Sequence, residues 1–135
     1  MNLSYPNIEY KRYSNNSRGS DGVEIVISYF TIYLIPILMI IIGVFIKLKA
    51  PKQINFFYGY RTQRSMSSQE AWDYAQQLLG KYSLRIGISL IPIGNLFLLI
   101  LPFSLDVITL INLGVGVICL LIPILFIEKE LKKKF

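Results

Sequence analysis

The chain has 135 residues, of which 53% are hydrophobic and only 16% charged, and its formal net charge is +6. Its apolar residues occur in blocks too long for the helices or strands of a small core, which argues against a soluble one-domain protein. The absence of histidine and the single cysteine, Cys119, leave no ordinary zinc constellation and no intrachain disulfide.

The first 22 residues differ in composition from the rest of the chain. They are rich in Asn, Ser and Tyr and show no hydrophobic period. Segments of this kind bury too little apolar surface to fold by themselves. We therefore expect a flexible external tail over residues 1–22 and a membrane domain over residues 23–135.

Three long runs of the remaining sequence lack charged side chains. A helix needs about 20 apolar residues to cross about 30 Å of hydrocarbon, and it satisfies its own backbone hydrogen bonds there. The sequence thus predicts an all-α membrane protein with three transmembrane helices, at about 25–46, 85–104 and 107–127. The turn between the second and third spans is short enough to require an antiparallel hairpin.

The basic residues lie on alternate sides of these spans. The loop 47–84 and its border hold seven Lys and Arg against Glu70 and Asp73, and the tail 128–135 holds four lysines. The turn between spans two and three offers only Asp106. The positive-inside rule places loop and tail in the cytoplasm and the N-terminus outside. Because the charge flanks spans, it does not indicate a nucleic-acid partner.

Small and amide side chains occur within the second and third spans. Gly87 and Gly94 lie on nearly one face of the second span, next to Asn95, and the third span holds Asn112. Small residues allow close helix approach, and a buried Asn prefers a helix partner to lipid. We interpret all four as helix-packing positions, with both asparagines facing the hairpin interior. An intramembrane ligand site is the alternative.

The cytoplasmic loop begins with turn signals and aromatic residues. Pro51 ends the first helix, and the aromatic run 56–60 suits the lipid headgroup level. Arg61 and Arg64 follow at once. Arginine makes bidentate contacts to phosphate, so we expect these two to contact anionic lipid or a partner.

A helix start is predicted in the second half of the loop. Ser67 and Glu70 have capping-box spacing, which predicts a helix beginning near Ser68. The following residues predict a short interfacial amphipathic helix that turns into the second span around Gly80. Trp72 is expected to anchor this helix in the interface, to pack against the turn at 59–62, or to do both, since the two roles are compatible.

Taken together, the loop residues resemble the signature loop of the SdpI family of bacterial membrane proteins, and the order of spans, loop and turn is similar over roughly residues 25–130. The matching residues are Pro51, Asn55, Tyr58, Gly59, Tyr60, Arg61, Thr62, Ser65, Trp72, Ala75, Gly80 and Lys81. The chain departs from the family pattern at Gln69 and Gln76, where asparagine is expected. The resemblance implies a multi-pass protein of the bacterial plasma membrane.

The resemblance also implies a function, because the namesake of the family confers immunity to a secreted peptide toxin. We therefore expect protection against a membrane-active peptide. The alternative is a module whose basic loop recruits a cytoplasmic regulator or a membrane partner. An enzyme acting on lipid phosphate is disfavoured, since Glu70 and Asp73 are the only loop carboxylates and histidine is absent. We expect membrane lipids as partners, with no catalytic residues, cofactor, metal or nucleic acid.

Overall fold

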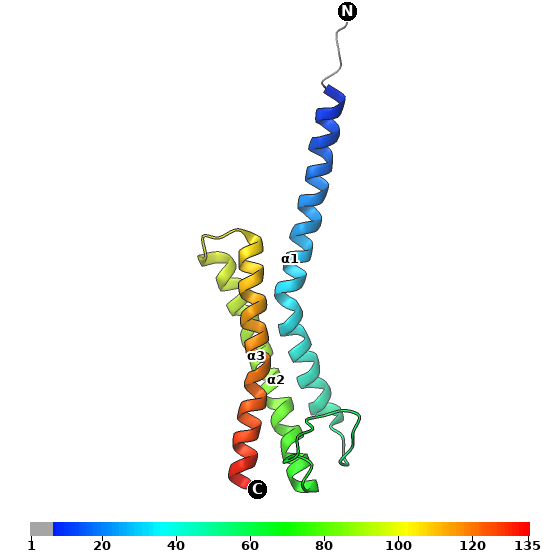
Figure 1. Ribbon diagram of the computed structural model, residues 1–135, viewed down its shortest axis with the longest axis vertical. Helices are drawn as coiled ribbons and strands as arrows, with labels where there is room; N and C mark the ends of the chain where they lie inside the picture. The colour runs from blue at the N-terminus through cyan, green and yellow to red at the C-terminus, as the bar shows by residue number, and fades with distance from the viewer. Residues whose placement is uncertain (1–6) are drawn as a thin grey trace, which may run out of the picture.

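The computed structural model describes the backbone of residues 7–135 and the side chains of residues 21–135. It contains three helices, α1 (Asn7–Lys49), α2 (Gln69–Ile100) and α3 (Leu105–Lys134). Each is long and apolar enough to cross a membrane, so the predicted all-α architecture with three spans is confirmed. Figure 1 shows α2 and α3 as an antiparallel hairpin beside α1, with the loop and the C-terminus at the same end.

Helix α1 extends beyond its predicted apolar span. It is continuous from Asn7, so regular structure reaches into the stretch 7–22, for which the composition predicts none. Extending an existing helix adds one hydrogen bond per residue without a new nucleation step, which favours this continuation. The first six residues lie outside the described part of the chain, and the external position of the stretch stays a prediction.

The expected short interfacial helix is not found as a separate element. Helix α2 begins at Gln69 and continues through Gly80 to Ile100. A Cβ atom on Gly80 would lie 3.4 Å from the Gly43 carbonyl oxygen and from the Lys47 nitrogen. The glycine therefore permits close packing of α2 on α1 and does not end a helix.

The start of α2 agrees with the prediction, but a different serine caps it. The Ser68 hydroxyl accepts a hydrogen bond from the Ala71 N–H at 3.1 Å. Ser67 instead donates to the Arg64 carbonyl at 2.7 Å. The predicted capping role of Ser67 is wrong because Ser67 belongs to the preceding turn.

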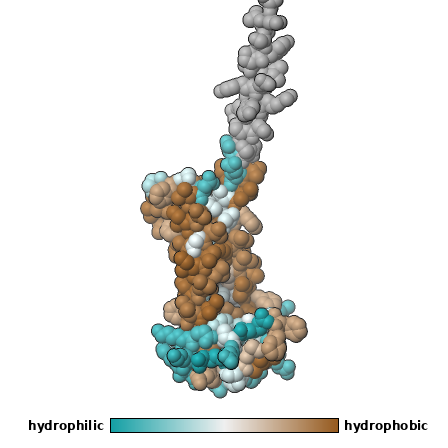
Figure 2. Space-filling view, viewed as in Figure 1, coloured by the Kyte–Doolittle hydropathy of each residue, from teal (hydrophilic) through white to brown (hydrophobic). Residues whose placement is uncertain are grey.

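The best-buried side chains gather at the end of the bundle where the loop packs. Of the largest fully buried side chains, all except Met39 lie in the loop or in the neighbouring parts of α2 and α3, namely Trp72, Ile127, Leu131, Gln76 and Ser65. Away from this end, the three spans have an apolar outer surface. Figure 2 shows this surface as a hydrophobic band, with hydrophilic residues at the loop end. The loop end is thus a small packed core attached to a lipid-facing bundle.

Candidate functional site

Two side chains of α2 hold the loop against the bundle. Trp72 is fully buried, and its indole N–H donates to the Pro51 carbonyl at 2.8 Å. Gln76 lies one turn later on the same face, and it is 1% exposed. Its side-chain oxygen accepts from the Tyr60 N–H at 2.8 Å, and its nitrogen donates to the Tyr60 carbonyl at 3.1 Å. The beginning and the middle of the loop are therefore fixed on one helix.

A glycine allows Gln76 to approach the loop backbone. Gly59 has φ +105°, a left-handed conformation that side chains other than glycine rarely adopt. A Cβ atom there would lie 2.6 Å from the Gln76 side-chain oxygen. Both the backbone angle and the space therefore require glycine at this position.

Thr62 and Ser65 form reciprocal hydrogen bonds that hold the next turn of the loop. The Ser65 hydroxyl accepts from the Thr62 N–H at 2.8 Å, and the Ser65 N–H donates to the Thr62 hydroxyl at 3.2 Å. The same Ser65 hydroxyl, fully buried, donates to the Tyr60 carbonyl at 2.9 Å. Such local side-chain bonds replace the pairing that a helix or sheet would supply.

Tyr60 also links the loop to α3. Its ring is buried, and its hydroxyl lies 3.0 Å from a Glu128 carboxylate oxygen and 3.3 Å from the Ile124 carbonyl. Burial, together with the hydrogen bond and the charge of Glu128, raises the pKa of the Tyr60 hydroxyl well above its ordinary value. The hydroxyl therefore stays protonated and acts as a donor. Tyr60 thus forms hydrogen bonds to α2 through its backbone and to α3 through its hydroxyl.

The outer part of the loop is organised by Asn55 and Arg61. The Asn55 side-chain oxygen accepts from the N–H groups of Phe57 and Tyr58 at 3.0 and 3.1 Å. The Arg61 guanidinium donates to the Phe56 carbonyl. Phe56 and Phe57 are 78% and 90% exposed, so this tight turn presents two aromatic rings outward.

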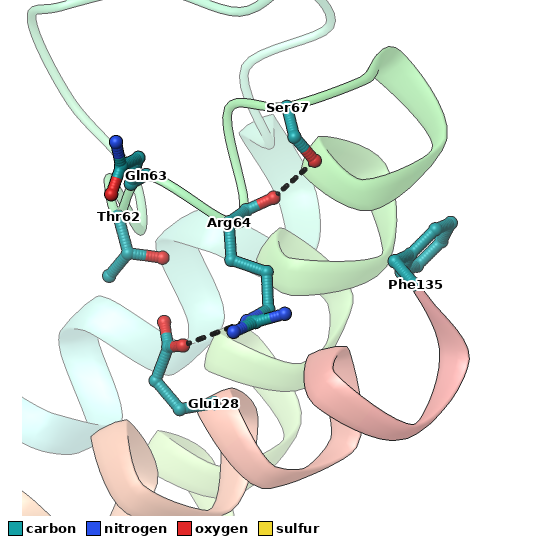
Figure 3. Close-up of a pocket in the computed structure, with 6 residues that line it drawn as sticks. All are labelled: Thr62, Gln63, Arg64, Ser67, Glu128 and Phe135. Atoms are coloured by element: carbon teal, nitrogen blue, oxygen red, sulfur yellow. Dashed lines mark hydrogen bonds and ion pairs between the residues drawn. The ribbon is translucent and has the colours of Figure 1, made fainter.

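A polar pocket of about 520 Å³ lies between the loop residues 62–67 and the C-terminal end of the chain, from which Glu128 and Phe135 contribute. Arg64 and Glu128 face each other there, as Figure 3 shows, with 3.6 Å between the Arg64 Nε and a Glu128 oxygen. Both side chains are more than a third exposed, so solvent screens this ion pair and its contribution to stability is small. Arg64 is therefore paired with a carboxylate of α3.

A second hollow, the loop-capped cleft, has a volume of about 390 Å³ and lies where the three helices converge. Its walls are mainly apolar and come from Met39 and Ile42 of α1, Leu79 and Ser83 of α2, and Leu120, Pro123 and Ile124 of α3. The loop residues 59–62 line its end. The arrangement can bind a mainly apolar group and offer hydrogen bonds at one end.

Comparison with known protein families identifies a match that includes most of this loop. A model of the SdpI/YfhL protein family matches residues 52–127, more than half of the chain. The chain belongs to this family.

A curated family relative, "Uncharacterized protein YfhL" of Bacillus subtilis (strain 168), is 45% identical over 67 residues. The match covers 46% of this chain and 61% of the relative, less than two thirds of that protein. No solved structure matches the chain.

The family-loop residues named from the sequence gather around two centres. Gly59 and Tyr60 lie at the Gln76 amide, and Ser65, which is bonded to Thr62, donates to the Tyr60 carbonyl. Asn55, Tyr58 and Arg61 form the outer turn. Trp72 is fully buried, and its indole hydrogen bond joins it to Pro51 at the start of the loop, whereas the contact expected with the turn at 59–62 stays a prediction.

The intramembrane residues contact α1 as well as the hairpin. A Cβ atom on Gly87 would lie 2.9 Å from the Pro36 carbonyl oxygen, and one on Gly94 would lie 3.2 Å from the Asn112 side-chain oxygen. Asn112 also donates to the carbonyl one turn back in its own helix at 3.0 Å. Asn95 accepts from the Tyr33 hydroxyl of α1 at 2.6 Å, so its partner lies outside the hairpin.

Sequence reasoning did not identify Gln76 or Glu128 as parts of the site. Gln76 had a signal, because it falls one turn after Trp72 on the face that is otherwise apolar. Glu128 had none, since it stands among the charges that follow the third span and meets Tyr60 only through the packing of α3.

Proposed function

We propose that this family member protects the bacterial cell against a membrane-active peptide toxin by binding it in the loop-capped cleft. The observation that carries the proposal is that the family loop lines the end of a cleft to which all three spans contribute. A binding role is proposed and not a reaction: Glu70 and Asp73, at the start of α2, line neither hollow, and Glu128 in the polar pocket is paired with Arg64.

The chemistry of the cleft suits a peptide inserted in the membrane. Such a peptide brings apolar side chains and, near the interface, backbone amides that lose water on binding. The cleft offers apolar walls together with the polar residues Arg61 and Thr62 at one end. Ligand sites commonly combine apolar walls with a few placed polar groups.

Arg61 is the residue with the most exacting geometry in this proposal. Its guanidinium carries five N–H donors, and one nitrogen already donates to the Phe56 carbonyl, which orients the group. The remaining donors can reach a bound peptide. Lysine has a single ammonium group and cannot both hold the turn and present a planar fork.

A second candidate function is recruitment of a cytoplasmic regulator or a membrane protein. It is favoured by the open polar pocket with Thr62, Arg64 and Glu128 and by the exposed rings of Phe56 and Phe57. This function would leave the loop-capped cleft unoccupied, so variants of the two surfaces distinguish the candidates.

The test is the survival of a sensitive bacterial strain that expresses each variant and is exposed to the membrane-active peptide toxin. An immunoblot checks that each variant reaches the membrane in the same amount as the wild type. We expect Leu120→Phe, which places a larger side chain in the cleft and so reduces the space for a peptide, to lower protection by at least tenfold. We expect Arg61→Lys to abolish protection, because the directed hydrogen bonds are lost while the charge remains.

Leu121→Phe is the matched control, since Leu121 is adjacent, of the same type, 55% exposed and outside the cleft lining. It should protect as the wild type does. Full protection by both Leu120→Phe and Arg61→Lys would contradict binding in the cleft. Loss of a co-purifying cytosolic protein in Arg64→Ala, with protection intact, would favour the recruitment function.

A further inference from the structure

A third hollow, the outer groove, lies between α1 and α2 and contains three basic side chains. Its volume is about 480 Å³, and Lys47 of α1 and Lys81 and Arg85 of α2 line it. Neither the loop residues 51–68 nor α3 contributes to it. It is therefore separate from the loop-capped cleft and from Arg61 and Arg64.

Close helix packing brings these cations together. A Cβ atom on Gly43 would lie 2.6 Å from the Leu84 nitrogen, so the two backbones almost touch there. Lys47 lies one turn after Gly43 on α1, while Lys81 and Arg85 are one turn apart on α2 and flank Leu84. The groove thus has three cations around a narrow helix crossing.

No ion pair among the described residues neutralises these charges. Within residues 21–135 the ion pairs are Arg64–Glu128, Lys133–Glu130 and Lys134–Glu70, and none involves the groove. Of the remaining polar side chains in the lining, Gln77 is exposed, whereas the buried Gln76 amide is bonded to Tyr60. A ligand for the groove must therefore bring negative charge.

The groove also lies at the boundary between charged and uncharged sequence. Lys47 directly follows the uncharged run 25–46, and Arg85 directly precedes the uncharged run 86–105. Ile46 and Leu84 form apolar parts of the lining. Ile88, 53% exposed, continues the Leu84 face one turn further into the span. An occupant at this level meets cations at one end and a hydrocarbon surface at the other.

We propose that the outer groove is a binding site for one anionic phospholipid. The phosphate lies among Lys47, Lys81 and Arg85, and an acyl chain follows Leu84 and Ile88 along the spans. Three cations exceed the single charge of a phosphodiester, so a lipid with two phosphates, as in cardiolipin, fits better than one with a single phosphate. Basic pockets between spans on the cytoplasmic side bind such headgroups in other membrane proteins. The inference does not rest on the proposed function.

The experiment is native mass spectrometry of the full chain in neutral detergent, titrated with cardiolipin, phosphatidylglycerol or phosphatidylethanolamine. We expect one cardiolipin to bind, with weaker phosphatidylglycerol and no specific phosphatidylethanolamine. Each cation near an anionic headgroup contributes about fivefold, so the triple variant K47Q/K81Q/R85Q should bind cardiolipin on the order of 100-fold more weakly.

The matched control is K49Q/K129Q/K132Q, which removes the same charge at the same membrane face from residues outside the groove. It should change the affinity less than twofold. Equal loss in both triples would overturn the proposal in favour of general surface attraction. Displacement of the lipid by soluble glycerophosphate would overturn it too, because the apolar part would then contribute nothing.

Circular dichroism melts without lipid should be the same for both triples and the wild type. Where the groove triple does not fold, Arg85→Gln with Lys129→Gln as its control replaces it. We then expect an affinity loss of about fivefold for Arg85→Gln alone. No difference between these two single variants would also overturn the proposal.

Discussion

At the scale of single residues, the Gln76 amide does for Tyr60 what a neighbouring β-strand would do. It pairs with both the N–H and the carbonyl of one loop residue in a buried place, where unpaired backbone groups are costly. From the sequence resemblance, asparagine is expected at position 76, and the chain has glutamine there. Glutamine has one more methylene, so its amide reaches further from the helix, and Gly59 leaves the space that it enters.

We predict that Gln76→Leu loosens the loop without removing it from the bundle. The Tyr60 carbonyl keeps its bond from Ser65, but its N–H loses the Gln76 acceptor. Leaving a buried donor unpaired costs about 1–3 kcal/mol. Hydrogen exchange in nanodiscs should therefore be faster at residues 58–62.

The control for this prediction is Gln77→Leu, which changes the next residue on the exposed side of the helix. It should leave exchange in the loop as in the wild type. Unchanged protection of the Tyr60 amide in Gln76→Leu would show that the Gln76 pairing does not hold the loop.

At the scale of elements, α2 has two parts with different surroundings. Its first part buries Trp72 and Ala75 against the loop, and its later part faces lipid with residues such as Leu99, 83% exposed. Because the helix is continuous, the position of the loop is coupled to the position of the second span. The N-terminal cap at Ser68 therefore stabilises the element that holds the loop.

We predict that Ser68→Ala weakens the first turn of α2 by about 0.5–2 kcal/mol, the usual cost of losing a capping side chain. Amide exchange should rise at Ala71, whose N–H donates to the Ser68 hydroxyl. Ser67→Ala is the control, since that hydroxyl bonds the Arg64 carbonyl outside the helix. A larger effect from Ser67→Ala than from Ser68→Ala would contradict the assigned cap.

At the scale of the whole molecule, the three helices are joined most closely where glycines remove side chains. Gly43, Gly80 and Gly87 bring α1 and α2 together, and Gly116 of α3 lies against Ile35 of α1. In lipid, where no hydrophobic effect drives helices together, such backbone approach provides much of the packing. The loop and the tail then form a polar end on this bundle (Figure 2).

We predict that this polar end is cytoplasmic, from the count of basic residues in 47–84 and 128–135. In a Cys119→Ser background, single cysteines replace Gln63 of the loop or Ser104 of the short turn between α2 and α3. An impermeant maleimide added to intact cells should label position 104 and leave position 63 unlabelled. External labelling of position 63 would reverse the orientation.

The sequence alone determined the number of spans, the hairpin, the start of a helix near Ser68 and the family. These follow from properties that are read along the chain, namely the length of an apolar run, the shortness of a turn and the order of motif residues. Charge along the chain likewise suffices for a prediction of orientation.

Only the tertiary structure decided which polar groups meet. The sequence around Gly80 predicts a turn, yet Gly80 lies inside α2. Its missing side chain allows α1 to pack closely against α2 at this position. Tyr60 and Glu128 are 68 residues apart, and Asn95 is 62 residues from Tyr33. No local pattern encodes such pairs, because each depends on how the helices are rotated and packed, and that is set by many side chains together.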